Sequence, residues 1–225
     1  MAPKLILIEG NIASGKSTIV TALQQLKGFG KIQCILEPLD AWQNIKDSSN
    51  ENILDKFYKD MKRYCYTFQS YAFLTRVALF DEIDYTADYV FMERSIFTDR
   101  DVFAKNCYMQ GIMHELEWKI YNDWFSWMLA KTFPKLDVTI LYLRCDPSIC
   151  KSRLDNRARS EEQSVNLQYL TQIHQRHEDW LLSEEVSIII DCSKDLNSIM
   201  NEIISKLPVF QHKTDDFSEL VGIAC

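Results

Sequence analysis

The chain has 225 residues, a formal net charge of −7 and a pI near 5.2, which argue against DNA or an acidic membrane surface as its main partner. Its composition, 47% hydrophobic and 25% charged, is ordinary for a soluble globular protein with a sizeable core. No apolar stretch approaches the roughly 18 residues that a membrane span needs, and a local basic cluster could still bind a small anion.

Five short apolar runs predict β-strands at residues 4–9, 32–37, 89–93, 138–144 and 186–191. Most are rich in β-branched or aromatic residues, which is typical of strands buried on both faces. The segments between them have helical spacing: 16–27, two helices within 51–82, then 98–130, 146–157, 164–182 and 195–206. This alternation predicts a parallel sheet with helices on both faces. We expect a single α/β domain over residues 1–225, in which 208–225 form a loosely held tail.

The predicted strands end in polar or glycine residues: Gly10, Glu37, Glu93 and Arg144. In open parallel sheets, ligands bind outside the carboxyl ends of the strands. We therefore expect the functional site at this edge of the sheet.

The seven cysteines include no CxxC pair, and several lie in apolar runs such as KIQCIL. This pattern predicts buried, reduced thiols in a reducing compartment. The first residues, MAPKLILIEG, lack the apolar region of a signal peptide, and the final GIAC does not place a Cys four residues from the end. We expect a cytoplasmic protein, or one made without a transit segment.

The segment GNIASGKS, residues 10–17, matches the phosphate-binding pattern G-x-x-x-x-G-K-[ST] between a predicted strand and a predicted helix. Its backbone N–H groups would surround a phosphate, Lys16 would reach the β- and γ-phosphates, and the Ser17 hydroxyl would bind Mg²⁺. A glycine-containing turn that matches by chance is the alternative. The candidate nucleotide-binding residues are Gly10, Asn11, Ile12, Ala13, Ser14, Gly15, Lys16, Ser17 and Thr18.

The chain lacks the sequence motifs of several classes of phosphate-loop protein. It has no NKxD guanine motif and no DxxG switch, which argues against a GTPase. The candidate acidic motif of motor and transport ATPases, LFDE at 79–82, falls in a helical pattern. Glu93, at the end of the third strand, could instead serve as the carboxylate near the metal. These absences favour a small phosphotransferase.

Five segments together resemble one family: GNIASGKST, EPLDAW (37–42), TFQSYAFLTR (67–76), ERSIFTDRDVF (93–103) and RLDNRARSEEQ (153–163). In order and spacing they are similar to deoxyribonucleoside kinases, and closest to the deoxycytidine kinase and deoxyguanosine kinase branch, over roughly residues 4–182. The resemblance implies a P-loop kinase fold with a five-stranded parallel sheet and an Arg-rich lid, and ATP with Mg²⁺. It also implies a homodimer formed through a helix pair, for which 98–130 is the candidate segment.

The resemblance implies that Glu37 is the general base for a sugar 5′-OH, that Arg94 bridges the attacking oxygen and the phosphoryl group, and that Glu93 holds Mg²⁺. Alternatives are a helix-capping role for Glu37 and a structural salt bridge for the Glu93–Arg94 pair. The lid arginines, which would contact the phosphates or else form a solvated helix end, are Arg153, Arg157 and Arg159.

The nucleoside would lie among residues from several segments. Glu162 and Tyr58 match the groups that reach the sugar 3′-OH, and Gln69 offers a donor and an acceptor to the edge of the base. The aromatic candidates for stacking and for closing the pocket are Phe103, Phe68 and Trp42, although a Phe at helical spacing is more often part of the core.

Asp99 and Arg76 match a charged pair that lies behind the base in this branch. An ionised Asp accepts hydrogen bonds from the exocyclic amine of cytosine or adenine and disfavours the O4 carbonyl of thymine. We expect deoxycytidine and deoxyadenosine as good substrates and thymidine as a poor one, and leave deoxyguanosine open. Phe57 departs from the family pattern, with a bulkier side chain beside Tyr58 than relatives carry.

The donor base is expected near residues 191–196, where ATP rather than UTP is a family expectation. Two other functions remain open: a nucleoside-monophosphate kinase, and a phosphate-loop protein that binds nucleotide without catalysis. The first would need groups that hold an acceptor phosphate, typically an Asp-Arg pair where this chain has Glu-Arg-Ser. The second is disfavoured because the residues needed for catalysis are all present: Lys16, Ser17, Glu37, Glu93 and Arg94.

Overall fold

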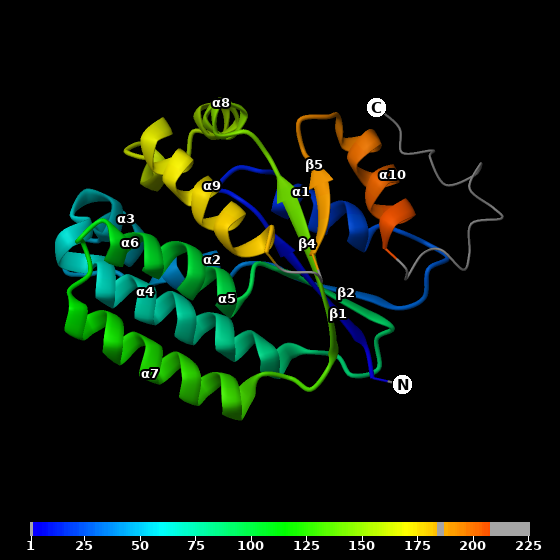
Figure 1. Ribbon diagram of the computed structural model, residues 1–225, viewed down its shortest axis with the longest axis horizontal. Helices are drawn as coiled ribbons and strands as arrows, with labels where there is room; N and C mark the ends of the chain where they lie inside the picture. Colours follow the sequence, from blue (N-terminus) through cyan, green and yellow to red (C-terminus); the bar gives the residue numbers. More distant parts are fainter. Residues whose placement is uncertain (1, 184–186, 208–225) are drawn as a thin grey trace.

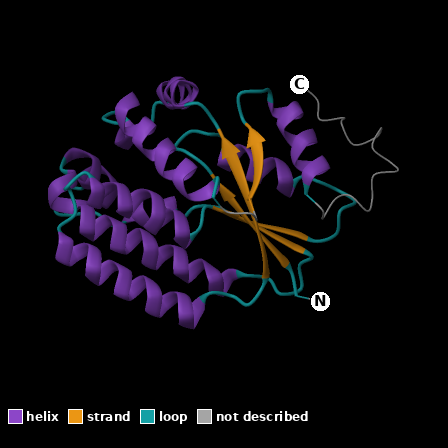
Figure 2. Cartoon of the chain, in the orientation of Figure 1, coloured by secondary structure: helices purple, strands orange, loops and turns teal. Residues whose placement is uncertain are grey.

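A computed structural model describes residues 2–183 and 187–207. Five strands form one parallel sheet, in which β1 lies at the centre and the order is β2-β3-β1-β4-β5 (Figures 1 and 2). The strand bounds are β1 Lys4–Glu9, β2 Ile32–Ile35, β3 Tyr89–Glu93, β4 Asp137–Arg144 and β5 Ser187–Asp191. The predicted parallel sheet flanked by helices is confirmed. The expected tail, 208–225, lies outside the described residues.

The helices of the first half are α1 Lys16–Gln24, α2 Leu39–Asn44, α3 Ile53–Lys59, α4 Met61–Ala78 and a 3₁₀ turn η1 Leu79–Glu82. The middle of the chain forms α5 Ile96–Thr98, a π-helical turn η2 Asp99–Ala104, α6 Lys105–Met109 and α7 Glu115–Thr132. The last part contains α8 Pro147–Arg157, a 3₁₀ turn η3 Ser160–Glu162, α9 Leu167–Leu181 and α10 Leu196–Lys206. Within the described chain, no helix is long and apolar enough to cross a membrane.

Alternate residues of β1 face two separate hydrophobic cores. Leu5 and Leu7 pack in the core beneath α4 and α7, whereas Ile6 and Ile8 pack in the core beneath α1, α8 and α10. Figure 1 shows α4 and α7 side by side on one side of the sheet and α1 and α10 on the other. All four side chains are at most 1% exposed, and burying each contributes about 2 kcal/mol, so the centre of the sheet is a rigid base for the loops at its edge.

Three elements differ from the sequence expectation. The expected helix 98–130 is broken, because Gly111 has a φ of 66° that ends α6 and His114 caps a new helix, α7. The short helix α2 was not predicted. The second strand ends at Ile35, so Glu37 lies two residues beyond it in the loop before α2.

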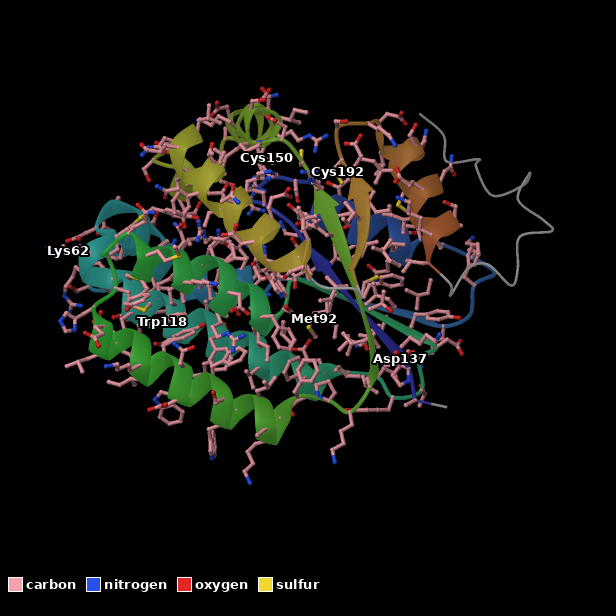
Figure 3. The ribbon with its side chains drawn as sticks, viewed as in Figure 1. Lys62, Met92, Trp118, Asp137, Cys150 and Cys192 are labelled. Atoms are coloured by element: carbon pink, nitrogen blue, oxygen red, sulfur yellow. The ribbon has the colours of Figure 1, made fainter. Side chains whose placement is uncertain are left out.

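Six of the seven cysteines lie among the described residues, and all six are free thiols. Five are buried as expected, and Cys34 is half-buried. Figure 3 shows two of them, Cys150 and Cys192, together near the carboxyl ends of β4 and β5. Met92, a residue of β3, has its side chain in the core that faces α4 and α7 (Figure 3).

Candidate active site

A cavity of about 590 Å³ opens at the carboxyl edge of the sheet. Residues from the phosphate loop, α2 to α4, the end of β3, η2, α8, η3 and the loop after β5 line it. The structure brings together nearly all of the predicted site residues; Gly10 and Asn11 alone do not line the cavity. Those that do are Ile12, Ala13, Ser14, Gly15, Lys16, Ser17, Thr18, Glu37, Trp42, Tyr58, Phe68, Gln69, Arg76, Glu93, Arg94, Asp99, Phe103, Arg153, Arg157, Arg159 and Glu162.

Gly10 and Asn11 shape the phosphate loop instead. Gly10 has a φ of 149°, and a Cβ there would lie 2.7 Å from the backbone oxygen of Leu143, so only glycine fits. The Asn11 side chain donates to the backbone oxygen of Leu170 at 2.9 Å and accepts from the Ile12 N–H at 2.8 Å. These bonds attach the loop to α9 and hold its backbone in place.

Lys16 is only 4% exposed and folds back over the loop. Its ammonium group donates to the backbone oxygens of Gly10 at 3.1 Å and Asn11 at 2.6 Å. Burial and the neighbouring Arg94 charge lower the pKa of Lys16 to about 8. A phosphate bound in the loop would stabilise the charge of this desolvated ammonium group.

Two oxygen ligands suited to a hard cation meet at the start of α1 and the end of β3. The Ser17 hydroxyl donates to Glu93 Oε1 at 2.8 Å. No cluster of three or more His, Cys, Asp and Glu side chains suited to a metal occurs in the described chain. One carboxylate and one hydroxyl beside a phosphate loop match Mg²⁺, which is usually held by few protein groups together with substrate phosphates.

Glu37 connects two arginines at the middle of the cavity. Its Oε1 accepts from Arg76 Nη2 at 3.0 Å and from Arg94 Nη1 at 3.1 Å. Burial opposes the charge of Glu37, but the two guanidinium groups outweigh it and hold its pKa at about 2. The N-cap residue of α2 is Pro38, and no side chain forms a capping hydrogen bond to this helix. The helix-capping alternative for Glu37 is therefore not supported.

Arg76 and Asp99 form a buried ion pair, with Arg76 Nε 2.7 Å from Asp99 Oδ2 and both side chains at most 3% exposed. Arg76 also donates to the backbone oxygen of Glu93 at 3.0 Å, so its guanidinium group joins the end of β3 to Glu37 and Asp99. Burial disfavours the charge of Arg76, but Asp99 and Glu37 raise its pKa. Burial raises the pKa of Asp99 against the attraction of Arg76.

The π-helical turn η2 carries Asp99 and Phe103, both of which line the cavity. π-helical turns recur at functional sites, where they change the direction in which side chains project. The Arg94 guanidinium group lies 4.8 Å from the centroid of the Phe103 ring, which links this wall to the phosphate end.

Gln69 and three aromatic rings line the inner part of the cavity. Gln69 is 1% exposed, and its Nε2 has no hydrogen-bond partner among the described residues. Phe57 stacks on Phe68, with ring centroids 4.8 Å apart and an interplanar angle of 28°, and Trp42 meets Phe68 edge-on at 5.3 Å. The cavity thus offers a flat aromatic wall beside an amide donor, a combination suited to a planar ring with polar edges.

The mouth of the cavity holds the lid arginines and Glu162. Arg157 forms a short ion pair with Glu162, and Arg159 lies 3.8 Å from the same carboxylate. Arg153 donates to the backbone oxygens of Ser14 at 3.2 Å and Cys192 at 2.8 Å. Arg153 therefore contacts the phosphate loop directly, whereas the other two arginines are held by Glu162.

Tyr58 lies close to Glu162, the residue with which it was predicted to bind the sugar. Burial and the Glu162 charge raise the pKa of Tyr58, so its hydroxyl stays a hydrogen-bond donor at neutral pH. Lys194 and Leu196, in the segment after β5 where the donor base was expected, also line the cavity, as does Ile199 of α10.

Sequence reasoning missed the apolar lining residues Ile19, Leu39, Leu54, Ala72 and Ile199. Helical spacing predicts that such residues are buried but does not distinguish a core from a cavity wall. Glu9 was also missed. It is the last residue of β1 and fully buried, and an acid that ends a predicted buried strand was the available signal.

A phosphate loop between the central strand and its helix, and an all-parallel sheet of order β2-β3-β1-β4-β5, define a P-loop phosphotransferase. A family model described as "Deoxynucleoside kinase" matches residues 6–210. The chain belongs to the deoxynucleoside kinase family, which makes it an ATP-dependent phosphotransferase.

Three relatives illustrate the similarity. The chain is 41% identical to a probable deoxycytidine kinase of fowlpox virus, over 79% of this chain and 72% of that protein. It is 36% identical to the deoxycytidine kinase of Bos taurus, over 92% and 90% of the two chains. It is 33% identical to a mitochondrial deoxyguanosine kinase of Xenopus laevis, over 87% and 80%.

Proposed function

We propose that the protein transfers the γ-phosphate of Mg·ATP to the 5′-OH of a deoxyribonucleoside, with deoxycytidine and deoxyadenosine as good substrates and thymidine as a poor one. The observation that carries the proposal is the network Asp99–Arg76–Glu37–Arg94, which runs through one cavity. This network joins groups suited to a nucleobase with groups suited to a phosphate. Such a site fits a nucleoside acceptor.

Glu37 and Arg94 are the proposed catalytic residues, together with Lys16. Glu37 orients the 5′-OH, whose oxygen forms a bond to the γ-phosphorus while the bond from that phosphorus to ADP breaks. The guanidinium groups of Arg94 and Arg76 lower the pKa of Glu37, so the carboxylate is ionised at neutral pH and can accept the hydroxyl proton during the transfer. Arg94 and Lys16 offset the charge on the transferring group, and positioning with charge neutralisation does most of the work in this chemistry.

Ser17 and Glu93 would hold Mg²⁺, and their 2.8 Å contact supports this assignment. When bound, the ion neutralises and orients the donor phosphates. Arg153, Arg157 and Arg159 are proposed to close over those phosphates, because guanidinium groups bind phosphate oxygens in bidentate fashion. The loop at 191–196 is proposed to hold the donor base, with ATP preferred to UTP.

The base is proposed to lie against Phe68 and Phe103, with Trp42 closing the pocket and Gln69 at its edge. The unpartnered Gln69 Nε2 supports this placement, since a buried donor without an acceptor is costly and a base acceptor would satisfy it. Asp99 would accept from an exocyclic amine, which cytosine and adenine have and thymine lacks.

Tyr58 and Glu162 are proposed to bind the sugar 3′-OH. In the structure, Glu162 is paired with Arg157. A closing lid would move Arg157 to the phosphates and free the carboxylate for the hydroxyl. Substrate binding and lid closure would then be coupled through this one ion pair.

We propose that the chain acts as a single domain and pairs with a second copy through α7. Four large side chains spaced three to four residues apart on α7 are 47–61% exposed, which is the pattern of an apolar helix face without a partner: Leu116, Ile120, Trp124 and Trp127. The six free thiols support a reducing compartment, and we propose the cytoplasm.

The first experiment compares initial rates with Mg·ATP for deoxycytidine, deoxyadenosine, deoxyguanosine and thymidine. Rates for the amine-bearing deoxycytidine and deoxyadenosine that exceed the thymidine rate by orders of magnitude support the proposal. Efficient thymidine phosphorylation would contradict the account of the base pocket. Turnover of dCMP or dTMP without turnover of nucleosides would indicate a nucleoside-monophosphate kinase instead.

Glu37→Ala separates catalysis from nucleotide binding. We expect this variant to bind ATP normally and to lose about 10²–10⁴-fold in kcat. A wild-type protein that binds ATP but phosphorylates none of these substrates would support the non-catalytic alternative.

A further inference from the structure

Glu9 is a fully buried carboxyl group that no step of the proposed reaction uses. It ends β1 and directly precedes the phosphate loop. Its Oε2 accepts a short hydrogen bond from the Thr98 hydroxyl, and the Ser95 hydroxyl also interacts with the carboxyl group. Its Oε1 has no hydrogen-bond partner among the described residues. A partly satisfied carboxyl group in this position is costly to bury.

The hydroxyl groups that Glu9 binds belong to the turn that carries Arg94. Arg94 has a φ of 62°, a left-handed conformation that costs a residue with a side chain about 1–2 kcal/mol. Its N–H donates to the backbone oxygen of Ile8 at 2.9 Å. Ser95 caps the following helix by accepting from the Thr98 N–H. Two adjacent residues of β1 therefore hold this turn, one through its backbone and one through its side chain.

We propose that Glu9 is a positioning residue for phosphoryl transfer, which holds the Arg94 turn in its left-handed conformation by binding the hydroxyls of Ser95 and Thr98. Glu9 also precedes Gly10, which passes so close to β4 that a Cβ there would lie 2.7 Å from the backbone oxygen of Leu143. The carboxyl group thus sets the position of the Arg94 turn relative to the phosphate loop. This inference rests on the proposed catalytic role of Arg94.

Stability alone does not account for a carboxyl group here. An apolar side chain of similar length would fill the position without an unpaired oxygen, but it would leave the buried hydroxyls of Ser95 and Thr98 without this acceptor, which costs about 1–3 kcal/mol. Because those hydroxyls lie in the turn that carries Arg94, removing Glu9 should displace the turn as well as lower the stability. Catalysis should therefore fall by more than the loss of stability explains.

The test uses Glu9→Ala and Glu9→Gln, with Leu181→Ala as a control that loses a buried core side chain outside the cavity. We expect Glu9→Ala to lower kcat about 100-fold, because small displacements of positioned groups have effects of this size. The KM values for ATP and for the nucleoside should each change by less than about threefold. Glu9→Gln keeps the shape and one acceptor, so its kcat should stay within about tenfold of wild type. Leu181→Ala should be less stable and retain its kcat.

Making Glu9→Ala in a protein that already carries Arg94→Ala shows whether Glu9 acts through Arg94. In an Arg94→Ala protein, Glu9→Ala should lower the single-turnover rate by less than about threefold. An equal loss in both backgrounds, or a folded Glu9→Ala with wild-type kcat, would overturn the inference. If Glu9→Ala does not fold, Thr98→Val removes the same bond and should lower kcat about tenfold, and an unchanged kcat would overturn the inference equally.

The same variants separate this inference from the function on which it rests. Full activity in Arg94→Ala would overturn the proposed role of Arg94 and the inference with it. An inactive Arg94→Ala beside a fully active Glu9→Ala would leave the proposed function intact and overturn the inference alone.

Discussion

Removing the Asp99 carboxylate should change both stability and base selectivity. Breaking a buried ion pair costs about 3–5 kcal/mol in the free energy of unfolding. Arg76 would keep its bonds to the Glu93 backbone oxygen and to Glu37, each at 3.0 Å. We therefore expect Asp99→Ala to lie at the lower end, near 3 kcal/mol.

A matched double variant also replaces Arg76, the cation that Asp99→Ala leaves without its partner. Arg76→Leu in the Asp99→Ala background removes the buried charge that the first change leaves behind. The double variant should lose about 2 kcal/mol less in unfolding free energy than the two single variants together. Urea unfolding of the four proteins at one pH measures this difference.

Base selectivity provides the second measurement. Asp99 favours deoxycytidine over thymidine, so Asp99→Ala should lower the ratio of their kcat/KM values about 30-fold, which corresponds to roughly 2 kcal/mol. The double variant should accept thymidine better still, since the pair also fills space. An unchanged ratio in a folded double variant would refute the account of how this pair screens the base. Additive stability losses would refute the ion-pair energetics.

Three further predictions concern separate parts of the molecule. Burial lowers the pKa of His177 to about 3, so below pH 6.5 the unfolded chain binds a proton that the folded chain does not bind. The free energy of unfolding, measured in urea, should therefore fall between pH 6.5 and 4. His177→Asn should reduce this fall by about 1.4 kcal/mol per pH unit. Phe57→Leu enlarges the pocket beside Phe68 and should raise the kcat/KM of deoxyadenosine relative to deoxycytidine, measured by initial rates, about threefold or more. Trp124→Lys places a charge on the exposed face of α7 and should convert a dimer to a monomer in analytical ultracentrifugation.

Each of these has a clear contrary result. An acid stability profile unaltered by His177→Asn would mean that the imidazole does not titrate as its burial requires. A lower purine preference in Phe57→Leu would mean that the ring supports the larger base. A monomeric wild-type protein would exclude pairing through α7.

Much of the architecture was predictable because it depends on local patterns. Buried strands appear as short apolar runs, and the phosphate loop depends on eight consecutive residues between a strand and a helix. The break within 98–130 was less predictable, since one glycine and one capping histidine interrupt a segment whose helical spacing continues on both sides. Most roles in the site came from a resemblance between motifs, because spacing alone does not distinguish a catalytic arginine from a solvated one.

The sequence by itself determined the strand order along the chain, the phosphate loop and the polar groups that follow the strands. Only the tertiary structure decided which of these groups pair. Arg76 meets Asp99 across 23 residues, Arg94 meets Glu37 across 57, and Ser17 meets Glu93 across 76. The burial of Glu9 against the Arg94 turn was likewise decided by the register of β1 against β3. The physical reason is that periodicity reports the conformation of one segment, whereas an ion pair depends on how separate segments pack together.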